Sequence, residues 1–277
     1  MSKEQLEYII DESTCIDDEK KTSTVVLVHG FPDDISVWNQ TSQFLCQRGF
    51  RVVRISLPGF EQKQPIGVPM SFDDVVERVR NTLLHTHSWG GILIGHDWGA
   101  IFLYMLLHKY PDAAQKIVTL EVGAAPRSVL ILSFVLFYHS ILNVIYGFGG
   151  VMGDRMMRWF CLFLPRSKEH SVMQARSKHA WLYRQAWKEG AVYGPWCWYF
   201  RNIVALWKPQ PNVPFLFLFG TDTHPWFRFH CETWREETTS ICSLSQTMGL
   251  PGRHWFFLEY PEEWNRALEE FLCEREN

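Results

Sequence analysis

The segment from residue 92 to 100 constrains the fold more than any other part of the chain, and its sequence is Ile-Leu-Ile-Gly-His-Asp-Trp-Gly-Ala. An uncharged apolar run ends in a small-X-Asp-X-small pattern, and apolar residues at helical spacing follow it. This order predicts a strand, a sharp turn and a helix, with Asp97 at the tip of the turn. Gly95 and Gly99 flank the tip because side chains there would clash with so tight a backbone.

An aspartate at the tip limits the chemistry. Attack of a carboxylate on an ester would give a reactive anhydride, whereas attack on a saturated carbon gives an alkyl ester that water can hydrolyse. The simpler alternative is that Asp97 only caps the following helix, since Asp is a favoured N-cap residue. The tip therefore predicts a nucleophile for displacement at carbon and disfavours a serine-type esterase.

Composition narrows the class of protein. The 277 residues are 47% hydrophobic and 21% charged, which suits one large domain or one domain with an insertion. A net charge of −3 without a basic run argues against nucleic acid as a partner. The seven cysteines form no CxxC pair, and the N-terminus lacks the apolar core of a signal peptide. We expect a cytoplasmic protein with reduced thiols, no metal and no cofactor.

Short apolar runs alternate with helical spacings along most of the chain. The predicted strands are 24–29, 51–57, 91–95, 116–122, 213–219 and 240–248, and the predicted helices are 36–47, 73–85 with Ser71 as N-cap, 98–110 and 262–274. Strands that alternate with helices form mostly parallel sheets with right-handed crossovers. The pattern predicts an α/β fold with a mostly parallel central sheet flanked by helices.

Residues 127–207 interrupt this alternation, because they show only helical segments rich in aromatic residues and methionine. We expect a helical cap over 127–207 inserted into a core domain of 1–126 and 208–277. Such a cap would lie over the carboxyl ends of the strands, where open α/β sheets bind ligands. Segment 129–148 is nearly long enough to span a bilayer, but its polar residues favour a buried or substrate-facing helix. Contact with a membrane surface is the alternative.

Four landmarks give the chain a family resemblance. They are His29-Gly30-Phe31-Pro32-Asp33, Gly95-His96-Asp97-Trp98-Gly99, Gly220-Thr221-Asp222 and Gly252-Arg253-His254-Trp255. In this order and spacing, from about residue 24 to 272, the chain resembles the α/β-hydrolase fold. It resembles more closely the branch that contains epoxide hydrolases and haloalkane dehalogenases.

The resemblance implies a set of catalytic residues. Asp97 would be the nucleophile and His254 the general base, since imidazole titrates near the working pH. The backbone N–H groups of Phe31 and Trp98 would form the oxyanion hole. The acid that orients the base would be Asp222, with Glu121 as the alternative after the preceding core strand.

The resemblance also implies groups that contact the substrate and the leaving group. Residues expected to line the substrate site are His29, Pro32, His96 and Trp98. In epoxide hydrolases two cap tyrosines protonate the opening ring, and one precedes an Arg-Asn pair. Tyr199 is the candidate here, although Phe200 directly precedes Arg201-Asn202. The candidates for the second tyrosine are Tyr138, Tyr146, Tyr183 and Tyr193.

Three functions compete at this point. The first is hydrolysis of an epoxide in a small lipophilic substrate to a diol, through an alkyl ester of Asp97. The second is dehalogenation of a haloalkane or haloacid, with Trp98 binding the halide. Phe31 weakens it, because dehalogenases usually carry Asn at that place. The third is a catalytically inactive ligand-binding or scaffold protein of the same fold.

Overall fold

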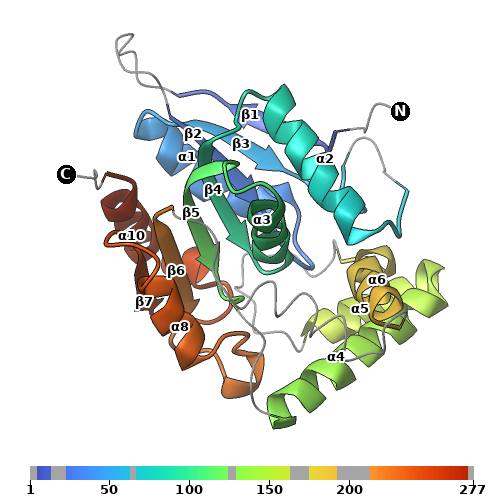
Figure 1. The fold of residues 1–277 in the computed structure, drawn as a ribbon. Coiled ribbons are helices and arrows are strands. Elements are labelled where there is room, and N and C mark those ends of the chain that lie inside the picture. Colours follow the sequence, from blue (N-terminus) through green and yellow to red (C-terminus); the bar gives the residue numbers. More distant parts are fainter. Residues whose placement is uncertain are drawn as a thin grey trace.

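A seven-stranded sheet forms the centre of the computed structural model, which describes residues 5–13, 23–62, 67–123, 129–162, 175–191 and 213–273 (Figure 1). The strands are β1 (Tyr8–Asp11), β2 (Thr24–Val28), β3 (Arg51–Ile55), β4 (Gly91–His96), β5 (Ala114–Leu120), β6 (Phe215–Gly220) and β7 (Gln246–Leu250). Their order in the sheet is β1-β3-β2-β4-β5-β6-β7. Only the pairing of β1 with β3 is antiparallel. The predicted fold class is therefore confirmed.

Helices cover both faces of the sheet. The core helices are α1 (Asn39–Gln47), α2 (Phe72–His85), α3 (Trp98–Lys109), α8 (Glu232–Thr239), α9 (Phe256–Glu259) and α10 (Pro261–Cys273). Side chains of α2, α3 and α8 pack into one apolar cluster, and those of α1, α9 and α10 pack into the other. Strands β2 and β4 are buried between these two layers, which explains their uncharged sequences.

Several local predictions can be checked against these elements. Ser71 caps α2, because its hydroxyl accepts a hydrogen bond from the Asp74 N–H at 3.1 Å. Strand β1, which has four residues and lies at the sheet edge, was not predicted from the sequence. The last strand was expected over 240–248, but β7 starts only at Gln246.

The insertion between β5 and β6 is helical in its described parts. It contains α4 (Val129–Phe148), α5 (Gly150–Leu162) and α6 (Trp181–Ala191), which group together beside the carboxyl ends of β4 and β5 (Figure 1). The expected boundaries near 127 and 207 lie outside the described residues. Within the described chain, no helix combines the length and the apolar character needed to cross a membrane.

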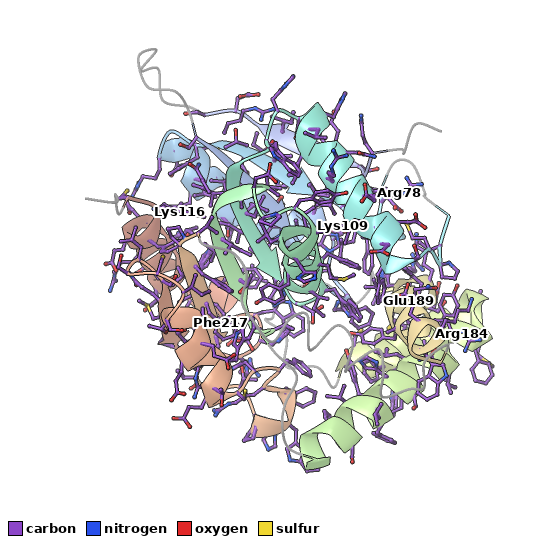
Figure 2. The ribbon with its side chains drawn as sticks, in the orientation of Figure 1. Arg78, Lys109, Lys116, Arg184, Glu189 and Phe217 are labelled. Atoms are coloured by element: carbon purple, nitrogen blue, oxygen red, sulfur yellow. The ribbon has the colours of Figure 1, made fainter. Side chains whose placement is uncertain are left out.

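Two hydrogen bonds attach α6 to the core. The indole N–H of Trp181 donates to the carbonyl oxygen of Pro58 at 2.6 Å. The carboxylate of Glu189, labelled in Figure 2, accepts from the backbone N–H of Phe72 at 2.9 Å. That N–H lies in the first turn of α2, where an anion is favourable. The cap is thus fixed over the strand ends at both ends of α6.

Candidate active site

Asp97 occupies the sharp turn between β4 and α3, as the sequence predicted. Its φ of 52° and ψ of −120° are strained for a residue with a side chain. A Cβ on Gly99 would lie 2.3 Å from the carbonyl oxygen of Val28, and one on Gly95 would lie 2.8 Å from the backbone nitrogen of Ala100. Both flanking positions therefore require glycine. The side chain of Asp97 makes no N-cap hydrogen bond to the second or third residue of α3, so helix capping does not explain this residue.

Two backbone amides donate hydrogen bonds to the Asp97 carboxylate. The N–H of Phe31 donates to Oδ1 at 2.8 Å, and the N–H of Trp98 also bonds this carboxylate. Gly30 permits the approach, because a Cβ there would lie 2.4 Å from the Cβ of Asp97. The expected pair of oxyanion-hole donors is therefore assembled around the carboxylate, and Oδ2 is left facing the opposite side.

His254 faces Oδ2 from the loop that follows β7. Its Nε2 lies 3.8 Å from Oδ2, a distance longer than a direct hydrogen bond. The ring of His96 supports the backbone behind it, with Nε2 donating to the carbonyl oxygen of His254 at 3.0 Å. The neighbouring indole of Trp255 donates to the buried carboxylate of Asp33 at 2.7 Å. The backbone that carries His254 is thus fixed on both sides.

The structure places the two candidate acids in different surroundings. Glu121, completely buried directly after β5, places Oε2 at 3.5 Å from Nδ1 of His254, and its Oε1 accepts from the backbone N–H of Gly220. Asp222 is exposed, and its carboxylate accepts from the N–H of Gly252 at 3.1 Å. Asp222 therefore closes a turn after β6, and Glu121 is the carboxylate that faces His254.

Backbone strain gathers at this site. Three non-glycine residues in the described chain have positive φ, namely His87, Asp97 and Glu121, at 53°, 52° and 69°. Each such residue costs about 1–3 kcal/mol. Two of the three are the carboxylates on either side of His254, so the strained positions coincide with the ionisable cluster.

Burial and charge set the ionisation of the two facing groups. Burial raises the pKa of Asp97, although His254 and the amides of Trp98 and Phe31 oppose that shift. Burial alone would lower the pKa of His254, but Glu121 and Asp97 outweigh it, and the pKa lies above its ordinary value of 6.5. A raised pKa makes His254 a stronger base, and a desolvated Asp97 makes a more reactive carboxylate.

Two of the histidines expected at the substrate are buried in the framework around Asp97. His29 is completely buried, donates from Nδ1 to the carbonyl oxygen of Gly30 and accepts at Nε2 from the N–H of Leu57, both at 3.0 Å. His96 is also completely buried, and its one bonded nitrogen supports His254. Burial lowers the pKa of both rings, so they are neutral framework groups. Pro32 is buried beside Phe31, and its contact with a substrate stays a prediction.

A pair of cap tyrosines lies beside Phe31 and Trp98, the residues whose amides bond Asp97. The hydroxyls of Tyr138 on α4 and Tyr183 on α6 lie 2.8 Å apart. The ring of Tyr183 packs edge-on against Phe31 and Trp98, with centroid distances of 5.0 Å and 5.4 Å, and its hydroxyl is bonded by the Trp98 side chain. Burial raises the pKa of Tyr183 well above 10, so this phenol keeps its proton at neutral pH.

Of the remaining tyrosine candidates, the structure describes Tyr146. Tyr146 lies further along α4 and packs on the apolar core. Tyr199 and Tyr193 lie outside the described residues. Sequence reasoning named Tyr138 and Tyr183 but gave preference to Tyr199. In the described chain, no group of three or more His, Cys, Asp or Glu side chains could hold a metal ion.

Comparisons with known proteins agree with this architecture. Residues 23–139 match a family model described as the alpha/beta hydrolase fold. The bifunctional epoxide hydrolase 2 of Sus scrofa is 23% identical over 289 residues, which cover 90% of this chain and 51% of that protein. Epoxide hydrolase B of Mycobacterium tuberculosis is 30% identical over 109 residues, covering 38% of this chain and 30% of that protein. The chain thus spans about half or less of the length of these relatives.

A solved structure extends the likeness to the whole chain. A loop variant of the haloalkane dehalogenase DbeA from Bradyrhizobium elkanii superposes with a TM-score of 0.67 at 15% identity, covering 96% of this chain and 92% of that one. At this identity the similarity concerns the fold alone. The chain has the α/β-hydrolase fold, and its distant homologues include epoxide hydrolases.

Proposed function

We propose that this α/β hydrolase opens epoxides of lipophilic substrates to diols, with Asp97 as nucleophile, His254 as base and Glu121 as the orienting acid. The observation that carries the proposal is the arrangement of acid–base groups around one buried carboxylate. Nε2 of His254 lies 3.8 Å from Oδ2 of Asp97, and the cap supplies the hydrogen-bonded hydroxyls of Tyr138 and Tyr183.

In the first step Oδ2 of Asp97 attacks a ring carbon of the epoxide. The carbon–oxygen bond of the ring breaks, and its electron pair goes to the ring oxygen. That oxygen takes a proton from Tyr183, whose charge the neighbouring Tyr138 hydroxyl and Trp98 indole stabilise. Assistance of this kind is worth roughly 10²–10⁴ in rate. The product is a hydroxyalkyl ester of Asp97.

In the second step water hydrolyses this ester. His254 takes a proton from a water molecule that lies beside both Nε2 and the side chain of Asp97, whose Oδ2 is 3.8 Å from Nε2. The oxygen of this water bonds to the carboxyl carbon of Asp97. The negative charge develops on Oδ1, which already accepts from Phe31 at 2.8 Å. Collapse breaks the bond between the carboxyl carbon and the ester oxygen, which takes the remaining proton of the added water and leaves with the diol, so that the Asp97 carboxylate is restored. The proton held by His254 then returns to the phenolate of Tyr183, so protons balance over the cycle.

The dehalogenase alternative has less support. A halide leaves without a proton and needs N–H donors, and Trp98 would supply one of them. The Trp98 side chain bonds the Tyr183 hydroxyl, so the indole N–H is engaged by the pair that an epoxide needs. Phe31 stands where dehalogenases usually carry Asn. The inactive-scaffold alternative leaves unexplained why strain, burial and base all meet at Asp97.

Substitution of the two hydroxyls separates these functions. We expect Tyr183→Phe to slow alkylation of Asp97 by styrene oxide at least about 10-fold, a cautious bound for lost acid assistance. Tyr146→Phe is the matched control, because this tyrosine shares the cap without joining the hydroxyl pair, and it should react at the wild-type rate. Halide release from a 1-haloalkane without diol formation from any epoxide would support the dehalogenase instead.

A further inference from the structure

Helix α4 carries no charged residue and exposes large apolar side chains on its outer side. Its 20 residues include no Asp, Glu, Lys or Arg. Val135, Leu142 and Ile145 are buried inward, whereas Phe137 and Val144 are 62% and 53% exposed. A surface helix of a globular protein normally has charged and polar residues on its outer side. The outer side of α4 is therefore more apolar than expected for a helix surface that contacts only water.

Helix α5 continues this apolar surface. Val151, Met152 and Leu162 are 71%, 61% and 68% exposed, and they follow Phe148, which is 59% exposed at the end of α4. We call Phe137, Val144, Phe148, Val151, Met152 and Leu162 the cap apolar face. Seven of the twelve large hydrophobic residues exposed in the described chain lie on α4 and α5. Such a concentration marks an interaction site, because scattered single residues would be ordinary.

The charges beside the cap apolar face are basic. Arg155 is exposed on the same stripe of α5 as Val151, and Arg158 lies one turn further along. The single acidic residue of this helix, Asp154, accepts from the backbone and hydroxyl of Ser177, both at 2.8 Å, and pairs with Arg176 at 3.4 Å. Asp154 is thus turned toward the cap interior, and the outer side of α5 carries both apolar side chains and positively charged arginines. Anionic lipid headgroups complement such a surface.

We propose that the cap apolar face docks on the surface of an anionic lipid bilayer, with α4 and α5 lying in the headgroup plane. Bulky apolar side chains would enter the acyl boundary, while Arg155 and Arg158 would contact lipid phosphates. A lipid surface fits better than a protein partner, because Ser133 and Ser140 are the only exposed polar residues among the described side chains of α4, and the Ser140 hydroxyl already donates to the carbonyl oxygen of Leu136 at 2.8 Å. The proposal concerns binding and does not depend on the catalytic assignment.

Vesicle sedimentation tests this surface. We expect the full chain to co-sediment with vesicles of phosphatidylcholine and phosphatidylserine, and less with phosphatidylcholine alone. The triple variant Phe137→Ser, Val144→Ser, Val151→Ser should lower the partition coefficient at least about tenfold, a cautious bound for three lost apolar side chains. Ile10→Ser with Leu84→Ser is the matched control, since these residues are also exposed but lie on β1 and α2. The control should bind like the wild type.

A single charge substitution on the surface tests the proposal without changing a buried residue. Arg155→Glu changes one exposed side chain and should weaken binding to phosphatidylserine vesicles more than to neutral ones. Far-UV circular dichroism checks each variant. Three results would overturn the proposal: no sedimentation of the wild type with anionic vesicles, wild-type binding by the triple variant, or a dimer that the triple variant abolishes. The last result would assign the face to a second copy of the chain.

Discussion

Replacing Glu121 by glutamine tests which carboxylate orients the base. In the structure Oε1 of Glu121 accepts from the N–H of Gly220, and Oε2 lies 3.5 Å from Nδ1 of His254. A glutamine in this position must keep its oxygen on the Gly220 N–H. Its NH₂ group then faces Nδ1, so Nδ1 becomes the acceptor and the proton moves to Nε2. The nitrogen that faces Asp97 can no longer take a proton from water.

The expected loss follows from this tautomer change. The equivalent exchange in hydrolytic triads lowers kcat by about 10⁴. We expect hydrolysis of the alkyl ester to slow by about 10³–10⁴, because the residue is completely buried and no water can replace its charge. Alkylation of Asp97 does not need the base and should change little. Single-turnover kinetics with styrene oxide, with mass spectrometry of the Asp97 peptide, separates the two steps.

Asp222→Asn is the matched control for this experiment. The Asp222 carboxylate accepts from the N–H of Gly252 at 3.1 Å on the protein surface, and an asparagine oxygen can keep that bond. We expect its rates to stay within about threefold of wild type, the scale of one exposed neutral hydrogen bond. Near-normal ester hydrolysis in Glu121→Gln, together with an inactive Asp222→Asn, would refute the assignment of the acid.

Three further outcomes follow from the same geometry. His254→Gln should accumulate the alkyl ester as added mass on the peptide that carries Asp97, and the double variant with Asp97→Ala should carry none; an unmodified peptide in the single variant would exclude His254 as the base. In the free protein the imidazole of His254 should titrate in NMR with a midpoint above 6.5, because Glu121 and Asp97 raise its pKa; a midpoint below 6.5 would contradict this. Gly99→Ala should destabilise the fold by about 3 kcal/mol in urea unfolding, since its Cβ would lie 2.3 Å from a carbonyl oxygen of β2. Gly147→Ala, within helix α4 and with open space around it, should not destabilise the fold, and equal stability of both variants would show that the turn relaxes.

The sequence predicted the elements that depend on local patterns. The turn at Asp97 requires glycine on both sides, and the Ser71 cap depends on one hydroxyl and the next turn. Strand β1 was missed because only four residues at the sheet edge pair with one neighbour, which leaves a weak apolar pattern. The start of β7 was misplaced because its residues are mostly half-buried and alternate little.

The acid could not be chosen from sequence because both candidates follow neighbouring strands. Strands β5 and β6 pair in parallel, so Glu121 and Asp222 leave the sheet at the same edge. Their distance from His254 depends on backbone direction after each strand, which residue spacing does not encode. The pairing of the two tyrosines was equally hard to predict from the sequence, because 45 positions separate Tyr138 from Tyr183 and only the packing of the cap brings their hydroxyls together.

The strained backbone helps to identify the candidate site in a way that neither residue spacing nor burial does. A carboxylate at the end of a buried strand would normally turn toward solvent, because burying it without a partner is costly. Glu121 instead adopts a φ of 69° and is completely buried, as Asp97 adopts 52° at the turn. Both conformations cost free energy, and both bring a carboxylate to the same imidazole. A backbone that bears this cost twice around His254 is organised to hold one carboxylate on each side of an imidazole, which a fold kept only for packing would not require.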